Sequence, residues 1–100
     1  MKGKGALGGI VSKALRSGAD IIDVEYKDGY EEVFAMRGGV GYGIARFRSS
    51  SPEGSALRKE LYGLTKRKQR IVLDDMQYEL RTRVYDSFGE DAFQIRLRRV

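Results

Sequence analysis

Hydrophobic side chains near the start of the chain recur with the period of an α-helix. They occupy positions 7, 10, 11, 14 and 15, one face of a helix whose polar side holds Lys13 and Arg16. Gly18 follows, and glycine commonly ends helices because it adopts a left-handed conformation without steric cost. The pattern predicts a helix that ends just before Gly18. The glycine-rich residues 1–5 are expected to be disordered, because glycine loses the most backbone entropy when it becomes ordered.

After this helix the period changes to two, the spacing of a β-strand. Ile22, Val24 and Tyr26 alternate with charged residues, and the Asp-Gly pair at 28–29 is favoured in tight hairpins. A partner strand is expected over residues 31–37. The pattern predicts an antiparallel hairpin.

A third strand is expected over residues 40–48, after a Gly-Gly pair at 38–39. Gly41, Gly43 and Ala45 form a nearly bare side of this strand. The larger side chains point the other way: Val40, Tyr42 and Ile44. Because small residues let a helix approach a sheet closely, we expect the first helix to pack against the bare side.

A second helix is predicted to start at the Ser-Ser-Ser-Pro-Glu sequence of residues 49–53. Serine caps helix starts, proline fits the first turn, and a carboxylate there favours the positive end of the helix dipole. Leu57, Leu61 and Leu64 form the apolar face. The cations at residues 66–68 are expected in its last turn, where they favour the negative end of the dipole.

The remaining residues predict three more strands. Residues 71–73 are expected to form a short buried strand, followed by a turn at residues 74–75. Apolar and polar residues then alternate over 78–85 and 93–98, on either side of a turn near Gly89. One face of this hairpin is apolar and belongs to the core. The other face collects four arginines: Arg81, Arg83, Arg96 and Arg98.

The predicted order α-β-β-β-α-β-β-β defines an α+β fold, a mostly antiparallel sheet with two helices packed on it. Residues 1–100 are expected to form a single domain, because a chain of this length can bury a core without a stabilising cofactor. We therefore expect no cofactor. The sequence contains no apolar run of roughly 18 residues, the length that a transmembrane segment needs. A cytoplasmic location is expected.

Composition removes much enzyme chemistry from consideration. The chain contains neither cysteine nor histidine, which excludes disulfide scaffolds, thiolate and imidazole metal sites, and nucleophile–histidine catalysis. Its net charge is +5, from 19 Lys and Arg against 14 Asp and Glu. A basic excess spread along the chain strengthens encounters with any polyanion and selects none of them.

Phosphate-loop and carboxylate motifs are weak in this sequence. The glycine-rich residues 38–43 do not complete a G-x-G-x-x-G loop, because Ile44 stands where the last glycine belongs. Carboxylate pairs at 31–32, 74–75 and 90–91 are explained by strand alternation or turn chemistry. A non-enzymatic role is expected, and an enzyme that uses carboxylates and arginine is a third hypothesis.

Two basic clusters are candidate anion sites. The arginines at 81, 83, 96 and 98 suit planar, bidentate capture of phosphate or carboxylate, and a strand pair fixes their spacing. Equally, Glu79 and neighbouring acids can satisfy these arginines by cross-strand pairing. The secondary basic patch contains Lys66, Arg67, Lys68 and Arg70. It either binds phosphates or is the solvated end of the second helix.

Tyrosines near these cations bear on nucleic-acid binding, which combines basic residues with exposed aromatic rings. Tyr30, Tyr42 and Tyr85 are candidate stacking platforms. Half-buried tyrosines are also common on strands, so both interpretations remain.

Several short motifs occur in an order found in a known family. The first strand begins with Ala19-Asp20-Ile21-Ile22, and a later turn reads Met36-Arg37-Gly38-Gly39-Val40. The last hairpin contains Tyr78-Glu79-Leu80-Arg81-Thr82-Arg83 in its first strand, Gly89-Glu90 in its turn, and Gln94-Ile95-Arg96-Leu97-Arg98 in its second strand. Over about residues 19–99 this order resembles the N-terminal domain of the ATPases of type II secretion and of type IV pilus assembly and retraction. That family has histidine and aspartate where this chain has Ile22 and Gly38.

The resemblance implies a PAS-like α+β domain. In the family, arginines of the last strand pair reach a nucleotide held by an adjoining P-loop domain or neighbouring subunit, and they help couple hydrolysis to domain rotation. By motif position, Arg81 and Arg96 take that role. Because this chain has no Walker motif, the resemblance implies a non-catalytic module that docks to a protein partner or to a second copy. The alternative is a small basic nucleic-acid-binding domain that uses the same arginines.

Overall fold

A computed structural model describes residues 6–100 and contains two helices and six strands. In chain order these are α1 (Ala6–Arg16), β1 (Ile21–Lys27), β2 (Tyr30–Arg37), β3 (Val40–Arg48), α2 (Pro52–Leu64), β4 (Gln69–Leu73), β5 (Met76–Ser87) and β6 (Glu90–Arg99). This order confirms the predicted α+β fold. The disorder expected for residues 1–5 lies outside the described residues.

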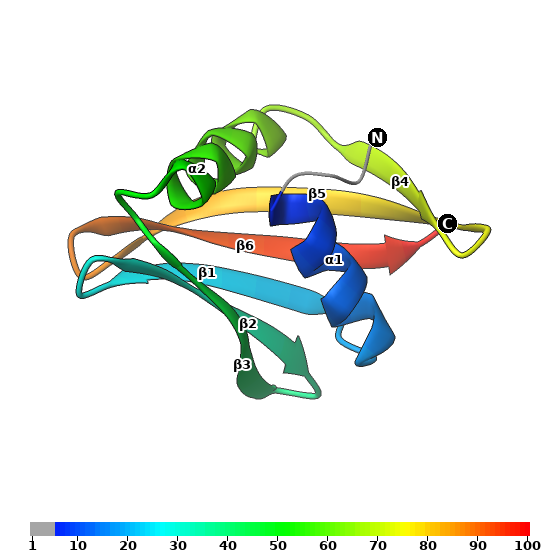
Figure 1. Cartoon of the computed structure of the whole chain (residues 1–100). Helices are drawn as coiled ribbons and strands as arrows, with labels where there is room; N and C mark the ends of the chain where they lie inside the picture. The colour runs from blue at the N-terminus through cyan, green and yellow to red at the C-terminus, as the bar shows by residue number, and fades with distance from the viewer. Residues whose placement is uncertain (1–5) are drawn as a thin grey trace.

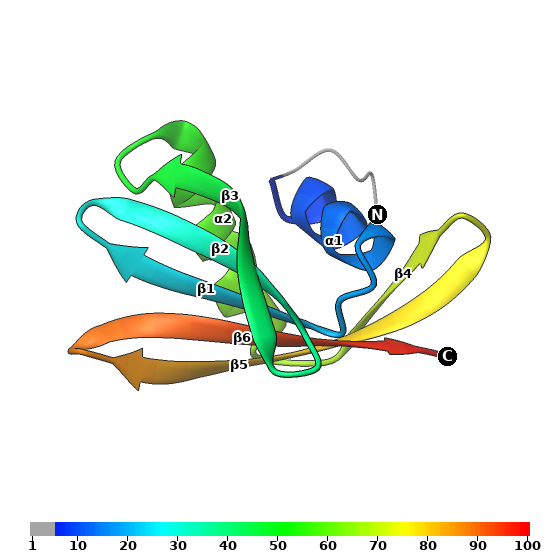
Figure 2. The same cartoon turned by 90° about the horizontal axis from the view of Figure 1, so that it is seen from below.

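All six strands form one antiparallel sheet, in the order β3-β2-β1-β6-β5-β4. Both helices lie on the same face of this sheet, which curves around α1 (Figures 1 and 2). The face that neither helix covers is called the open face below. The first and last strands, β1 and β6, are neighbours at the centre of the sheet.

The hydrophobic core lies between the helices and the sheet. Leu57 and Leu61 of α2 are fully buried there, as are Ile22, Phe93 and Ile95 of the central strands. Burying one such side chain stabilises the fold by about 1.5–3 kcal/mol. The buried positions of α1 are those of the predicted apolar face, and Gly18 follows that helix with a φ of 83°, as expected for a helix stop.

The predicted packing of the first helix on the bare side of β3 is wrong. A β-bulge pairs Val33 with Ala45 and the next residue, Phe34, with Gly43, so Ile44 is an extra residue and the alternation shifts. Gly43 consequently lies on the open face, and α1 packs on the other side. There Tyr42 Oη donates a hydrogen bond to Ser17 Oγ at 2.8 Å.

The second helix starts as predicted but ends earlier. Ser51 caps it by accepting a hydrogen bond from the Gly54 N–H at 3.0 Å, and Pro52 occupies the first turn. Thr65 is the C-terminal cap, and its hydroxyl donates to the Tyr62 carbonyl at 2.7 Å. Because the cap satisfies the helix end at this point, the cations at residues 66–68 follow the helix and do not lie in its last turn.

The strand expected to be buried at residues 71–73 is an exposed edge strand. β4 is the last strand in the sheet order and pairs with β5 alone among the described strands, so Val72 remains 68% exposed. Asp74 and Asp75 form the predicted turn, both with positive φ.

A buried ion pair connects the second helix to the sheet. Glu31 of β2 is 1% exposed and accepts hydrogen bonds from Arg58 Nη1 at 3.2 Å and Ser49 Oγ at 2.5 Å. Arg58 also donates to Tyr62 Oη, which in turn donates to Asp91 of β6. These hydrogen bonds join α2 to β2 through Glu31 and to β6 through Asp91, and so fix the position of the helix on the sheet.

Two glycines of α2 give a matched test of how closely that helix approaches β3. A Cβ at Gly54 would lie 2.2 Å from the Arg48 carbonyl oxygen, whereas a Cβ at Gly63 has no neighbour within 4 Å. Gly54→Ala is expected to lower the free energy of unfolding by about 1–3 kcal/mol, because backbone must move. Gly63→Ala is expected to raise it by up to about 1 kcal/mol through helix propensity. Urea unfolding measures both, and equal effects would contradict the packing.

Candidate anion-binding face of the sheet

The four arginines predicted on one face of the last hairpin do lie on one surface. In the β5–β6 register Arg81 is opposite Arg96, Arg83 is opposite Gln94, and Glu79 is opposite Arg98. Since alternate residues of a strand share a face, all four side chains belong to the open face. The residues that alternate with these arginines along the strands point to the other face, and Leu80, Ile95 and Leu97 are buried in the core as predicted. The four arginines are called the arginine face.

A hollow of about 370 Å³ lies within the arginine face. Its lining comprises Arg81, Thr82, Arg83, Gln94 and Arg96. Arg83 Nε donates a hydrogen bond to Gln94 Oε1 at 3.1 Å, which orients one guanidinium. The hollow thus offers three guanidinium groups and an amide.

Glu79 is the acidic partner of this surface. Its carboxylate is only 4% exposed and lies 3.4 Å from Arg81 Nε, 3.5 Å from Arg98 Nη2 and 3.7 Å from Lys68 Nζ. Burial raises the pKa of Glu79, but the three cations outweigh that effect and hold the pKa below its ordinary value. Internal pairing therefore accounts for Arg81 and Arg98, one of the two interpretations of the arginine face.

Pairing with a carboxylate does not explain Arg96 and Arg83. Among residues 6–100 neither forms an ion pair with a carboxylate, and Arg96 also has no side-chain hydrogen bond. Arg96 faces Arg81 directly across the strands, an arrangement that costs free energy because like charges repel. A bound anion would remove that repulsion.

The secondary basic patch adjoins the arginine face. A smaller hollow of about 260 Å³ is lined by Lys66, Arg67, Lys68 and Arg81, among others. Arg70 of β4 is paired with Glu79 of β5 in the sheet register. The basic surface is consequently continuous from residue 66 to the arginine face.

The three predicted stacking tyrosines do not form one platform. Tyr42 lies on the helix side of the sheet. Tyr30 lies on β2, next to the edge strand β3, with the guanidinium carbon of Arg46 3.7 Å from its ring centroid. Tyr85 is near the arginine face, but its hydroxyl donates to Asp23 Oδ1 at 3.5 Å. Burial, together with Asp23 and Glu25, raises the pKa of Tyr85 to about 12.

Acidic residues bound the basic surface on the β1 side. Asp23 is paired with Gln94 in the sheet register, one strand away from Arg83. Burial raises the pKa of Asp23, and hydrogen bonds with Gln94 and Tyr85 offset this only in part. The basic surface therefore stops at β6.

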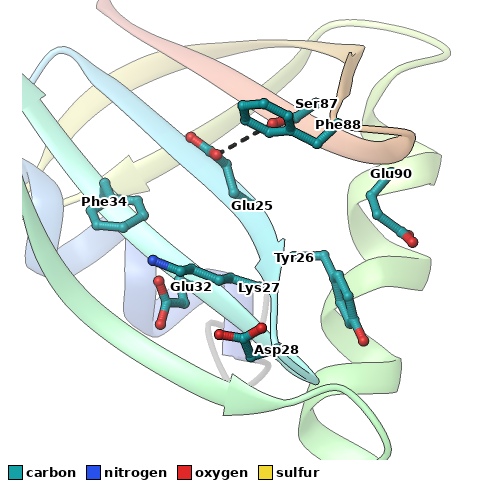
Figure 3. Close-up of a pocket in the computed structure, with 9 residues that line it drawn as sticks. All are labelled: Glu25, Tyr26, Lys27, Asp28, Glu32, Phe34, Ser87, Phe88 and Glu90. Carbon is teal, nitrogen blue, oxygen red and sulfur yellow. Dashed lines mark hydrogen bonds between the residues drawn. The ribbon is translucent and has the colours of Figure 1, made fainter.

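A second pocket, of about 550 Å³, opens between the tips of the β1–β2 and β5–β6 hairpins (Figure 3). It is called the tip pocket, and sequence reasoning missed it because two hairpins distant in sequence form it. Its carboxylates come from Glu25, Asp28, Glu32 and Glu90. Its aromatic rings come from Tyr26, Phe34 and Phe88. Ser87 Oγ donates a hydrogen bond to Glu25 Oε1 at 3.4 Å, drawn as the dashed line in Figure 3.

Phe88 is the most unusual residue of the tip pocket. It is fully exposed at the β5–β6 turn and has a φ of 54°, a left-handed conformation that costs bulky residues free energy. At the equivalent positions the other hairpin turns use aspartate or glycine, namely Asp28, Gly38 and Asp74. The Phe-Gly pair at 88–89 is the sequence signal that marks this turn.

No group of three or more acidic residues within residues 6–100 is arranged to hold a metal ion. Neither described helix has the length and apolar character needed to cross a membrane. Glu31 and Glu32 point to opposite faces of β2, as the strand alternation predicted.

The chain was compared with models of protein families and with curated protein sequences, and neither comparison finds a match. The resemblance to the N-terminal domain of secretion and pilus ATPases stays a prediction.

Glu79→Gln tests the charge balance of the arginine face. Because the pKa of Glu79 is lowered on folding, its carboxylate stabilises the fold above its ordinary value of 4.5. That stabilisation is lost as pH falls through the lowered pKa of Glu79 in the folded state. The variant is therefore expected to be less stable than the parent at pH 7, with the difference closing as pH falls below 4.5. Urea unfolding across this range measures it, with the exposed Asp20→Asn as control; parallel curves for Glu79→Gln and parent would contradict the assignment.

Phe88→Asn tests the conformation of the turn. Asparagine tolerates the left-handed region, and no buried contact is lost, so the free energy of unfolding is expected to rise by about 1 kcal/mol. Phe88→Ala, which keeps a Cβ of the same geometry, is the control and should change stability little. A loss of stability in Phe88→Asn, measured by chemical denaturation, would show that the phenyl ring packs on the domain.

Proposed function

We propose that this domain is a non-catalytic docking module whose arginine face holds an anionic group presented by a protein partner. One observation carries this proposal: Arg81 and Arg96 face each other across β5 and β6, beside Arg83. Within residues 6–100, Glu79 is the one carboxylate paired to the arginine face. An arrangement that costs the free domain stability is explained if a bound anion relieves the repulsion.

The chemistry of the hollow supports a phosphate or carboxylate group. Guanidinium groups bind such groups through paired hydrogen bonds, and the strand pair fixes the spacing of Arg81 and Arg96. Gln94 adds an amide that holds Arg83 in place. A rigid sheet keeps these groups ordered before binding, which reduces the entropy lost on association.

The resemblance to secretion and pilus ATPases points to the same arginines. By motif position Arg81 and Arg96 correspond to arginines that reach a nucleotide held by a partner domain or subunit. A partner that carries a nucleotide would present a phosphate group of the kind the hollow suits. On this proposal the module works in the cytoplasm and supplies binding groups, and the partner supplies any catalysis.

Nucleic-acid binding is the second candidate, and one observation favours it. The secondary basic patch, residues 66–70, is continuous with the arginine face through the hollow shared by Lys66, Arg67, Lys68 and Arg81. Asp23 and Glu25 of β1 count against it, because they would repel a phosphate backbone that crosses the sheet. The anionic group of a protein partner needs only the arginine face.

The experiment compares two labelled probes, oligoglutamate and oligothymidylate, by fluorescence anisotropy over a range of salt concentrations. Arg81→Gln combined with Arg96→Gln is expected to weaken oligoglutamate binding roughly tenfold or more, because charge-assisted hydrogen bonds are lost. Glu79→Gln is expected to strengthen it, since that change releases cations. Arg16→Gln combined with Lys59→Gln removes the same charge from exposed helix positions and serves as the control.

Two results would contradict the proposal. The first is equal oligoglutamate affinity in the Arg81/Arg96 double variant and the control. The second is oligothymidylate binding that is tighter at every salt concentration, falls steeply with salt and depends on Lys66 and Arg67. That second result would establish the nucleic-acid alternative.

A further inference from the structure

The open face carries opposite charges at its two ends. The tip pocket lies between the β1–β2 and β5–β6 turns and is lined by four carboxylates and one cation, Lys27. Of the four carboxylates, Glu32 also pairs with Arg46 of β3 at 3.5 Å, whereas Glu25 and Glu90 form no ion pair among the described residues. The arginine face lies further along the same two strands, from the middle of the hairpin toward β4. By the sheet register Glu25, Glu90 and Arg96 all point to this face. A chain with a net charge of +5 thus separates its charges along one surface.

This separation makes the surface complementary to itself. Arg96 lies six positions after Glu90 along β6, a span of about 20 Å at the rise of a strand. If two copies meet open face to open face about a two-fold axis that crosses the strands, each tip pocket meets the arginine face of the other copy. Such a two-fold contact ends at a dimer, because each copy uses the same surface and none is left free to bind a third copy.

We propose that the partner of the arginine face is the tip pocket of a second copy of this chain, in a symmetric dimer. The inference rests on the docking role proposed for the arginine face and names its occupant. Carboxylates of Glu25 and Glu90 from one copy would lie against Arg81 and Arg96 of the other. Both like-charged clusters are neutralised at the same time, which a partner that carries only anionic groups does not achieve.

Phe88 gains a role in this arrangement. Its fully exposed ring stands at the rim of the tip pocket, the part of the open face that would cover the other copy's guanidinium groups. Guanidinium groups stack favourably on aromatic rings, as Arg46 already does on Tyr30 within the chain at 3.7 Å. A contact of this kind explains why a left-handed turn position holds phenylalanine.

A charge exchange between two variants tests the dimer. In the first variant Arg81 and Arg96 are changed to glutamate, and in the second Glu25 and Glu90 are changed to lysine. Each variant alone places like charges in both contacts and is expected to be monomeric. An equimolar mixture restores opposite charges in both contacts and is expected to form a mixed dimer. Analytical ultracentrifugation measures the masses, native mass spectrometry identifies the pair, and thermal unfolding confirms that each variant is folded.

The parent and Phe88→Asn complete the test. The parent is expected to dimerise at low salt and to dissociate as salt screens the contacts. Phe88→Asn is expected to remain folded and to dimerise roughly tenfold more weakly than the parent. Mixing the parent dimer with oligoglutamate is expected to release monomers, since both occupy the arginine face.

Two outcomes overturn the dimer. One is a parent that stays monomeric at low salt across the accessible concentration range, and the other is a mixture of the two charge variants that stays monomeric. If the monomeric parent still binds oligoglutamate through Arg81 and Arg96, the docking role stands and only its occupant is wrong. If oligoglutamate binding does not depend on these arginines, the proposed function itself fails.

Discussion

The pairing of β1 with β6 is the constraint on which the rest of the structure depends. It joins two three-stranded halves of the sheet, each preceded by a helix, through the residue pairs from Ile21↔Arg96 to Val24↔Phe93. On the core side it brings Ile22 and Ile95 together, both fully buried. On the open face it places the acidic strand β1 beside the arginines of the last hairpin. Because the paired strands are distant in sequence, their association has a large loop-closure cost and is expected to come late in folding.

Local sequence signals predicted most of the fold, because each element carries its own pattern. The Ser51-Pro52 start of α2, the Asp-Gly turn at residues 28–29 and the alternation that collects the arginines of β5 and β6 need no information from elsewhere in the chain. The bulge at Ile44, the exposure of β4 and the tip pocket could not be predicted in this way, since each depends on which strands become neighbours. The arginine face was predicted, but the sharing of Glu79 by Arg81, Arg98 and Lys68 was not resolved from sequence alone.

The electrostatics of the open face follow from one buried carboxylate and its surroundings. Glu79 is shared by Arg81, Arg98 and Lys68, so the cations around it exceed what it can neutralise. The remaining acids of this face lie on the neighbouring strand β1, where Asp23 is one strand away from Arg83, and at the hairpin tips. The open face therefore carries a basic cluster around Arg81 and Arg96 and a group of carboxylates at the hairpin tips, and the modest net charge of the chain does not describe either one.

The exposed edge strand β4 gives the basic segment a further physical role. An edge strand presents unpaired backbone N–H and C=O groups, which invite strand addition and aggregation between molecules. β4 is short and carries the exposed Val72. It contains the cation Arg70, follows the cations at residues 66–68, and is followed by Asp74 and Asp75. Charges in these positions repel an approaching strand edge. The protection of this edge against strand addition and the charge of the basic surface are thus coupled through the same few side chains.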